Sequence, residues 1–319
     1  MRIRRLLQIG TLFSAILGAA YAQDAGHGRE PDGAFMVVNG KRIWYRAEGK
    51  GPPLLLVPGG PGASHTYFWP HLSSLSKEFE VIYYDPYGRG RSDAADNPAE
   101  YTFARDVDEI EGIRQALHLP KINLYGHSYG AMVAQAYALK YPDSLSHLIL
   151  VSPFHSSEAW QKGNNDTWNE QLRNHIPETW SRLQEMRRQG HLSCEEEYQR
   201  VQDEIPMTPS YYYNPSNATL SSLLDVNDQV YCQLAGPDAD LVLGGDMASL
   251  DFRPKLKEIK VPTLIIAGRW DRTAIPRFTT QYKELMPEAT FIIFEKSGHL
   301  PFIEEPDNHT GLVTDFLQN

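Results

Sequence analysis

The sequence predicts an α/β fold with a mostly parallel sheet, helices on both faces of the sheet and a helical cap inserted between two strands. Short apolar runs alternate with helix-like segments, which is typical of a parallel sheet covered on both faces. One of these runs leads through a glycine-bounded turn at 126–130 directly into a helix-like segment of small residues. The alternation stops near residue 153 and resumes near residue 257. We therefore expect the intervening segment to cover the carboxyl edge of the sheet, where ligands bind in such folds.

The individual elements follow from local patterns. Residues 35–38 and 41–45 flank Asn39-Gly40, a dipeptide that accepts the positive φ angles of a tight hairpin turn. The run at 54–57 is continuously apolar, as expected of a strand buried on both faces. Apolar residues at 107, 110, 113 and 117 have near-helical spacing. Further strands are predicted at 80–85, 121–125, 148–151, 263–267 and 290–294, and further helices at 130–140 and 306–318.

The N-terminus has the features of a targeting segment. Residues 1–22 combine three arginines, an apolar stretch and a small-x-small cleavage signal, which predicts a signal peptide and export to the periplasm or the medium. The alternative is an uncleaved membrane anchor. The remaining parts are predicted to be a flexible leader at 23–34, a core at 35–152 and 257–319, and a helical cap at 153–256.

Charge and cysteine content narrow the class of partner. Loss of residues 1–22 would remove three arginines and no acids, so the formal net charge would change from −10 to −13. This argues against nucleic-acid or membrane partners, which need clustered Lys and Arg, and leaves a small-molecule or short-peptide substrate. No cofactor or metal is expected. Cys194 and Cys232 lack metal-ligand spacing, and they either close a disulfide or remain separate buried thiols.

Gly126-His127-Ser128-Tyr129-Gly130 lies between a predicted strand and a predicted helix, which is the setting of a nucleophile elbow. The sharp turn strains the serine backbone and exposes its Oγ. Side chains at Gly126 or Gly130 would collide where the strand and the helix approach each other. Without this setting the pattern G-x-S-x-G is a weak signal. Within it, the pattern predicts that Ser128 is a nucleophile.

A nucleophilic serine needs a base, and the base needs an orienting carboxylate. After this kind of elbow the chain order is serine, acid, histidine. Asp271 and His299 each follow a predicted strand, so we expect both at the sheet edge that carries Ser128. The alternatives are a helix N-cap for Asp271 and a surface position for His299. Asp251 is a rival acid, although it lies further from any clear strand end.

The developing oxyanion needs backbone donors. The N–H of Tyr129, at the start of the predicted helix, is the first candidate. The second is expected from the glycine-rich loop at 57–62, with Gly60 as the donor, because glycine lets the backbone approach a substrate. Gly60–Pro61 also suggests a cis peptide bond in a tight turn. The alternative is an ordinary Gly/Pro loop.

At these residues the chain resembles an α/β-hydrolase of the proline iminopeptidase group, over most of residues 35–317. The loop at 59–62 resembles the family's His-Gly-Gly-Pro-Gly, and the loop at 85–92 resembles its Asp-Gln-x-Gly-x-Gly-x-Ser. The elbow and the Asp271/His299 pair match as well. The resemblance implies the α/β-hydrolase fold and a serine aminopeptidase or amidase that releases an N-terminal residue such as proline.

The chain departs from this family in two places. Pro58 stands where the family has a histidine, so whatever that imidazole orients must be held by another group. The family also binds the substrate's α-ammonium with cap glutamates, one in Gly-Pro-x-Glu, and here Ala239 occupies that position. The candidate substrate-binding residues are Glu197, the first choice, with Asp238, Asp240 and Trp160. The alternatives are a solvated helix face for the acidic run at 195–197 and plain cap core for the aromatic residues.

Three functional hypotheses follow. The first is an exported serine aminopeptidase or amidase that works through an acyl-enzyme. The second is a carboxylesterase or lactonase with the same triad and no ammonium clamp. The third is a non-catalytic binding protein, which the apparently intact Ser128–Asp271–His299 set disfavours. A dehalogenase or an epoxide hydrolase would carry aspartate at the elbow, so Ser128 argues against both.

Overall fold

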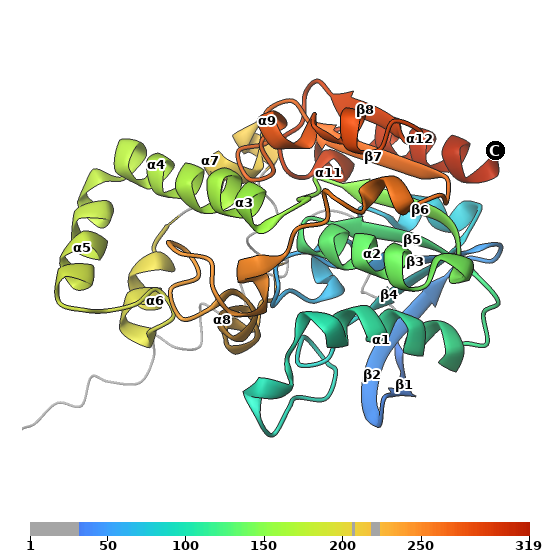
Figure 1. The fold of residues 1–319 in the computed structure, drawn as a ribbon, viewed down its shortest axis with the longest axis horizontal. Helices are drawn as coiled ribbons and strands as arrows, with labels where there is room; N and C mark the ends of the chain where they lie inside the picture. Colours follow the sequence, from blue (N-terminus) through green and yellow to red (C-terminus); the bar gives the residue numbers. More distant parts are fainter. Residues whose placement is uncertain (1–31, 206–207, 218–223) are drawn as a thin grey trace, which may run out of the picture. The chain divides into compact units, whose positions relative to one another are not determined.

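The computed structural model describes residues 32–205, 208–217 and 224–319, and the strands of these residues form one eight-stranded sheet (Figure 1). The strand order is β1-β2-β4-β3-β5-β6-β7-β8, and the pairs from β4 to β8 are parallel. The expected signal peptide at 1–22 and most of the leader at 23–34 lie outside the described residues. The strands are β1 (Ala34–Val38), β2 (Lys41–Glu48), β3 (Pro53–Val57), β4 (Glu80–Tyr84), β5 (Ile122–His127), β6 (Leu145–Val151), β7 (Thr263–Gly268) and β8 (Thr290–Phe294). The predicted mostly parallel sheet is confirmed.

The predicted hairpin and helices are also present. Asn39 and Gly40 have φ angles of 50° and 79°, and they turn β1 into an antiparallel pairing with β2. Helices of the core are α1 (Phe103–Ala116), α2 (Tyr129–Lys140), α9 (Pro276–Thr279), α10 (Tyr282–Leu285), α11 (Pro301–Glu304) and α12 (Pro306–Gln318). Helices between β6 and β7 are α3 (Ser157–Trp160), α4 (Asp166–His175), α5 (Pro177–Arg188), α6 (Glu196–Gln202), α7 (Thr208–Tyr211) and α8 (Asp228–Ala235).

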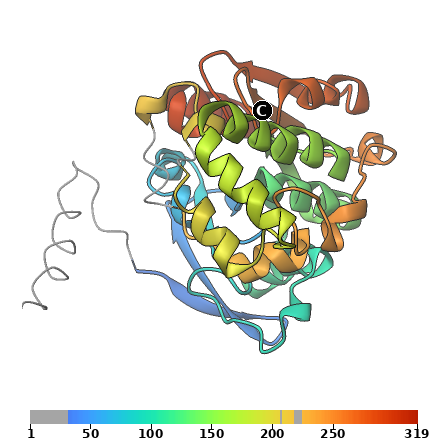
Figure 2. The same cartoon turned by 90° about the vertical axis from the view of Figure 1, so that its left-hand side faces the viewer.

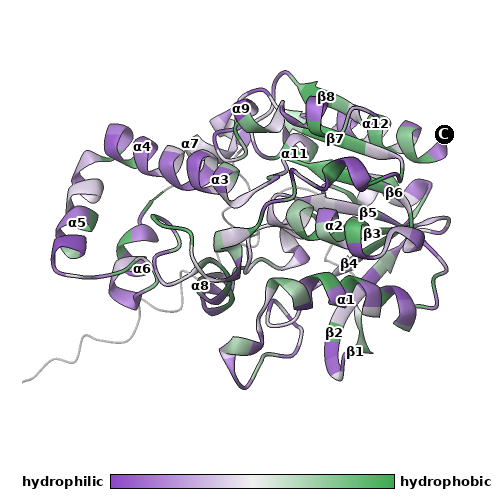
Figure 3. Ribbon diagram, viewed as in Figure 1, coloured by the Kyte–Doolittle hydropathy of each residue, from purple (hydrophilic) through white to green (hydrophobic). Residues whose placement is uncertain are grey.

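Alternate residues of the central strands enter two separate hydrophobic cores. In β3, Leu55 and Val57 pack in the core that contains residues of α1 and α2. Leu54 and Leu56 point to the opposite face, into the core that contains residues of α11 and α12. Successive side chains of a strand point to opposite faces, so burial on both faces requires a continuous apolar run. Figure 3 shows this as hydrophobic colouring along the central strands.

The helices between β6 and β7 gather at one end of the sheet (Figures 1 and 2). Two of them are rooted in the main core, which includes Trp160 of α3 and Val230 of α8. Helices α4, α5 and α6 share a small core of their own, made of Leu172, Leu183, Tyr198, Val201 and Ile205. In the parts of the chain that the structure describes, we find no helix with the length and apolar character needed to cross a membrane.

Candidate active site

Ser128 occupies a strained turn between β5 and α2. Its φ and ψ angles are 56° and −118°, which residues other than glycine rarely adopt. The two flanking glycines are required by packing: a Cβ on Gly126 would lie 2.5 Å from the carbonyl oxygen of Gly130, and one on Gly130 would overlap the carbonyl oxygen of Val57. The N–H of Ser128 is fixed on the carbonyl of Val151 at 2.9 Å. The local geometry is therefore that of a nucleophile elbow.

Asp271 and His299 meet below the same sheet edge. Nδ1 of His299 lies 2.9 Å from Oδ2 of Asp271, and the two residues are 1% and 3% exposed. The other carboxylate oxygen accepts the N–H groups of Thr273 and Ala274, both at 2.8 Å. Asp271 is not a helix N-cap, because the next helix, α9, begins at Pro276 with Ile275 as its N-cap; one oxygen of Asp271 closes a turn while the other contacts the imidazole. The rival Asp251 is bonded to Arg253 instead.

The carboxylate fixes the tautomer of His299. An ionised carboxylate only accepts hydrogen bonds, so the proton of the neutral imidazole lies on Nδ1 and Nε2 is left as the acceptor. The backbone N–H of His299 donates to the carbonyl of Tyr211 at 2.8 Å, and the rings of these two residues are 5.2 Å apart. His299 and Ser128 line the same cavity.

The glycine loop after β3 packs directly on the elbow. A Cβ on Gly59 would come within 2.9 Å of the Cβ of Ser128. The N–H of Gly59 is hydrogen-bonded to the hydroxyl of Tyr67 at 2.5 Å, and Gly60, the predicted donor, lines the cavity. Gly60 has a φ of 47°. The expected cis bond at Gly60–Pro61 is wrong, since the cis bond found in the described residues is Trp69–Pro70.

A buried ion pair that sequence analysis missed supports this loop. The guanidinium of Arg89 donates to the carbonyl of Pro61 through Nε at 2.8 Å and to both carboxylate oxygens of Asp106 at 2.8 and 2.7 Å. The hydroxyl of Tyr129 donates to the same carboxylate at 2.7 Å. The pair therefore ties the glycine-rich loop at 57–62, the candidate oxyanion loop, to the helix that begins beside Ser128. Its arginine lies in the loop at 85–92 that resembles the family, which was the available signal.

A cavity of about 890 Å³ lies between the elbow and the cap. Gly60, Ser128 and His299 line its core side. The cap contributes Trp160 and four acidic residues, which are Asp203, Glu204, Asp228 and Asp240. No lysine or arginine lines the cavity among the residues that the structure describes. The arrangement can hold a serine nucleophile beside a cationic group of a substrate.

Comparison with known proteins decides the family. Residues 52–306 match the family model of the alpha/beta hydrolase fold. The chain belongs to this family. A proline iminopeptidase of Heyndrickxia coagulans is 32% identical over 296 residues, which cover 89% of this chain and 98% of that protein. A proline iminopeptidase of Lactobacillus helveticus is 30% identical, with 88% and 96% covered. The chain is therefore a proline iminopeptidase-like hydrolase, as its motifs predicted.

The solved structures agree on the fold. The crystal structure of a proline iminopeptidase from Mycobacterium smegmatis superposes with a TM-score of 0.70 at 22% sequence identity. The superposition covers 90% of this hydrolase and 98% of that chain. At this identity the likeness shows the shared fold, and the expected α/β-hydrolase architecture is confirmed by it together with the family match.

Of the four predicted substrate-binding residues, the structure brings two to the cavity of this hydrolase. Trp160 and Asp240 line it. Glu197 does not: its side chain is 72% exposed, and a carboxylate oxygen lies 3.9 Å from Nε2 of His191. Asp238 is also absent from the lining and forms a two-pronged ion pair with Arg187 at 2.6 and 2.9 Å. For Glu197, the alternative of a solvated helix face describes the structure better.

Asp240 accepts hydrogen bonds from two helices that face the cavity, α6 and α8. Nε2 of Gln202, at the end of α6, donates to it at 3.0 Å, and the hydroxyl of Tyr231 in α8 donates at 2.9 Å. Enclosure by the cap raises the pKa of Asp240 above its ordinary value, while these two hydrogen bonds act in the opposite direction. Burial, and then the charge of Asp203, raise the pKa of Asp228. A bound cation would stabilise the ionised form of both acids.

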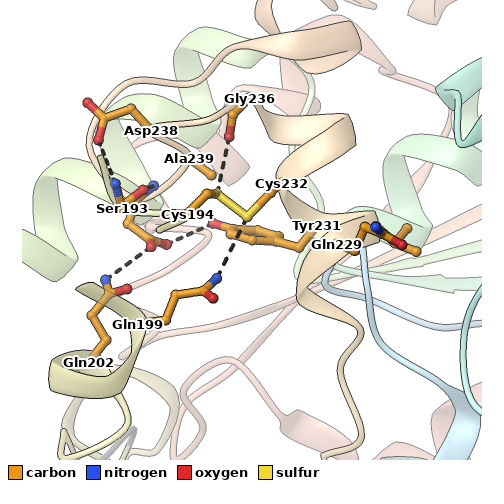
Figure 4. The surroundings of a disulfide bond; sticks show 12 residues. Ser193, Cys194, Gln199, Gln202, Gln229, Tyr231, Cys232, Gly236, Asp238 and Ala239 are labelled. Atoms are coloured by element: carbon orange, nitrogen blue, oxygen red, sulfur yellow. Dashed lines mark hydrogen bonds between the residues drawn. A yellow bond between two sulfur atoms is a disulfide. The ribbon is translucent and has the colours of Figure 1, made fainter. Parts of the chain in front are cut away.

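A disulfide joins α8 to the segment just before α6. Cys194 and Cys232 are bonded, with their Cα atoms 6.0 Å apart, so the open choice between a disulfide and two thiols is settled in favour of the disulfide. The bond ties the segment before α6 to α8, close to Tyr231 and Gln202 (Figure 4). Crosslinks of this kind limit the unfolded ensemble and hold the linked elements in register. The acidic wall of the cavity is therefore covalently supported.

Proposed function

We propose that the protein is a serine aminopeptidase that releases an N-terminal residue, with proline as the first candidate, through an acyl-enzyme on Ser128. The observation that carries the proposal is the shared cavity, because Ser128 and His299 face the same space as the carboxylates of the cap. The relatives named as proline iminopeptidases support it. Their names describe those proteins, and the activity of this chain is inferred from its own site.

The chemistry follows from the proton positions. As Oγ of Ser128 attacks the scissile carbonyl carbon, Nε2 of His299 takes its proton, and Asp271 stabilises the imidazolium that forms. The N–H groups of Gly60 and Tyr129 stabilise the oxyanion. His299 then gives the proton to the leaving nitrogen, so the peptide bond breaks and the acyl-enzyme remains. Water attacks this ester with the same assistance, which releases the residue and restores the serine.

Asp240 is the best candidate for the substrate's ammonium. A cation brought into a partly dry cavity needs a carboxylate within hydrogen-bond reach. Asp240 lines the same cavity as Ser128 and His299, and the hydroxyl of Tyr231 donates a hydrogen bond to its carboxylate. Asp228, on the same wall, is the second candidate.

The decisive experiment is a panel of chromogenic substrates with free and blocked amino groups. Aminoacyl anilides with free amines should be cleaved with higher kcat/KM than their N-acetyl counterparts, because only the free amines carry the charge that the acidic wall can bind. Equal rates on free, blocked and simple ester substrates would replace the aminopeptidase proposal with a carboxylesterase or lactonase. Absence of Ser128-dependent hydrolysis on the whole panel would favour a non-catalytic binding protein.

We also propose that the protein is exported after cleavage following residue 22. The sequence of the first 22 residues and the disulfide between Cys194 and Cys232 support this, because disulfides persist mainly in oxidising compartments. The intact mass of protein recovered from the periplasm or the medium tests it. A mature chain that begins at Gln23 is expected, and a full-length chain retained in the membrane fraction would contradict the proposal.

A further inference from the structure

A chain of buried hydrogen bonds connects the oxyanion loop with the backbone of the candidate catalytic histidine. The N–H of Gly59 donates to Oη of Tyr67 at 2.5 Å, and Tyr67 is 2.9 Å from Nδ1 of His127. Nε2 of His127 is 2.9 Å from the carbonyl oxygen of His299. Tyr67 and His127 are only 2% and 3% exposed. The loops on either side of Ser128 are thus joined through the residue that precedes it.

One arrangement of protons satisfies every group in this chain. The N–H of Gly59 can only donate, so the oxygen of Tyr67 accepts there and directs its own proton to Nδ1 of His127. Nδ1 must then be unprotonated, and the neutral imidazole carries its proton on Nε2. That N–H points at the carbonyl of His299, which can only accept. The contacts therefore fix both the tautomer and the orientation of His127.

His127 is held in this neutral form. Burial, and then the neighbouring His299, lower the pKa of His127 well below its ordinary value. A second proton would have to enter on Nδ1, where it would face the hydroxyl proton of Tyr67. The group is therefore suited to holding neighbouring backbone in place rather than to carrying a proton.

We propose that His127 is a positioning residue that, through Tyr67, keeps the oxyanion loop and the loop of His299 in register around Ser128. This inference rests on the proposed chemistry at Ser128 and is independent of amino-terminal specificity. It also accounts for Pro58, which stands where the resembling family has a histidine. In this chain the adjacent N–H of Gly59 is held by the Tyr67–His127 pair instead.

The two ends of the chain differ in redundancy. The carbonyl of His299 accepts a second hydrogen bond, from the hydroxyl of Ser152 at 3.0 Å. For the N–H of Gly59, the hydroxyl of Tyr67 is the acceptor that the described residues provide. Loss of His127 should therefore disturb the oxyanion loop more than the loop of His299.

The test compares Tyr67→Phe, His127→Asn and His127→Gln. Asparagine can place an oxygen near the position of Nδ1 and keep the acceptor for Tyr67, whereas glutamine can place an N–H near the position of Nε2 and keep the donor to His299. The matched control is Tyr125→Phe, because Tyr125 and His309 form a second buried pair at 3.0 Å that takes no part in the hydrogen bonds from Gly59 to His299. The readouts are the rate of labelling of Ser128 by a fluorophosphonate, kcat and KM on a p-nitrophenyl ester, and Tm.

Tyr67→Phe and His127→Gln should lower the labelling rate and kcat about 10- to 100-fold while KM changes less than about 3-fold, since oxyanion stabilisation acts in the transition state. His127→Asn should lose less than His127→Gln. The double variant Tyr67→Phe/His127→Gln should have rates no lower than those of the less active single variant, because both substitutions break the same chain of hydrogen bonds. Tyr125→Phe should keep both rates within about 2-fold of wild type, even if its Tm falls as much as that of Tyr67→Phe.

Equal rate losses in Tyr67→Phe and Tyr125→Phe would overturn the inference, since they would reflect general destabilisation. Independent, multiplicative losses in the double variant would overturn it too. The outcomes separate from those of the proposed function. A wild-type protein that labels at Ser128 but prefers esters removes only the aminopeptidase proposal, while an active aminopeptidase with an unaffected Tyr67→Phe variant removes only this inference.

Discussion

The two sides of the cavity are built in different ways. On the core side, Ser128, Asp271 and His299 are at most 5% exposed, and backbone hydrogen bonds fix each of them. On the cap side, the acids are open to the cavity or to solvent, and some are paired on the surface, as Glu204 is with Arg182. The core side can therefore hold reacting atoms in fixed geometry, while the cap side presents charge with less restraint.

The packing explains this difference. The core side stands on the two large hydrophobic clusters that flank the sheet. Helices α4 to α6 depend on a small cluster of five buried residues, and Figure 3 shows more hydrophilic colouring there than along the central strands. The disulfide between Cys194 and Cys232 supplies part of the order that packing does not. This difference fits the proposal that the core side carries the reaction while the cap side binds the substrate's charge.

The largest expected effect is the loss of the nucleophile on the core side. Ser128→Ala should reduce kcat by about a million-fold, as losses of triad members do in serine hydrolases, and leave Tm nearly unchanged because Oγ is needed only for chemistry. Hydrolysis of a chromogenic ester and thermal unfolding measure the two effects. A variant that kept about a tenth of wild-type activity would rule out Ser128 as nucleophile, because that loss is far too small for a triad member.

Asp271→Asn should reduce kcat about ten-thousand-fold, because an amide would favour the wrong tautomer of His299. The matched control is Asp251→Asn, which removes a carboxylate bonded to Arg253 and should leave kcat within about 2-fold of wild type. Steady-state kinetics of the two variants on one substrate decide between them. If Asp251→Asn were the more damaging change, the acid would have been misassigned.

The buried ion pair of the core should contribute more to the free energy of unfolding than an exposed ion pair of the cap. Arg89→Met leaves the buried carboxylate of Asp106 without its cation, which should lower the free energy of unfolding by about 3–5 kcal/mol. Arg182→Met in the cap removes a pair whose side chains are 55% and 54% exposed, and should change it by less than about 1 kcal/mol. Urea unfolding monitored by circular dichroism measures both. Similar values for the two variants would contradict the comparison.

On the cap side, Asp240→Asn should lower kcat/KM for free-amine substrates by a factor that corresponds to about 2–4 kcal/mol. It should barely affect simple esters, which carry no ammonium group for Asp240 to bind. Glu197→Gln is the matched control, since it neutralises a cap acid that lies outside the cavity. It should change neither substrate class. Equal losses on esters and amines in Asp240→Asn would mean that Asp240 only joins α6 to α8, and the esterase proposal would then gain.

A separate expected effect is a pH dependence of stability from Glu109, which is buried and accepts hydrogen bonds from the N–H of Tyr87. Burial, and then the charge of Asp106, raise the pKa of Glu109 to about 8 from an ordinary value of 4.5. The folded state keeps the proton between these values while the unfolded chain has lost it. The contribution of protonated Glu109 to the free energy of unfolding is complete below pH 4.5 and is lost as the pH rises through about 8. Urea unfolding at pH 5 and pH 8 should show a smaller decline in Glu109→Gln than in wild type.

Local signals explain why much of the core side could be predicted. The elbow requires glycines at 126 and 130 because strand and helix touch there, and the structure shows the contacts that exclude a Cβ. Asp271 and His299 were found because each follows an apolar strand, and parallel strands bring their carboxyl ends to one edge. The predictions for the cap were weaker because they rested on resemblance: Glu197 lies in a stretch similar to one in the family's cap, and Asp238 lies beside Ala239, which replaces the family's glutamate.

The sequence by itself determined the strands, the elbow and the order of the candidate triad. Each of these depends on neighbouring residues, on an apolar run or on the order of residues along the chain. The tertiary structure decided which acids face the cavity, because Asp203 follows α6, Asp228 begins α8 and no spacing relates them. It also decided the role of Tyr67 and His127, which are 60 residues apart in sequence. Hydrogen bonds between such distant groups leave no pattern in the sequence, because they depend on how the loops pack once the sheet has formed.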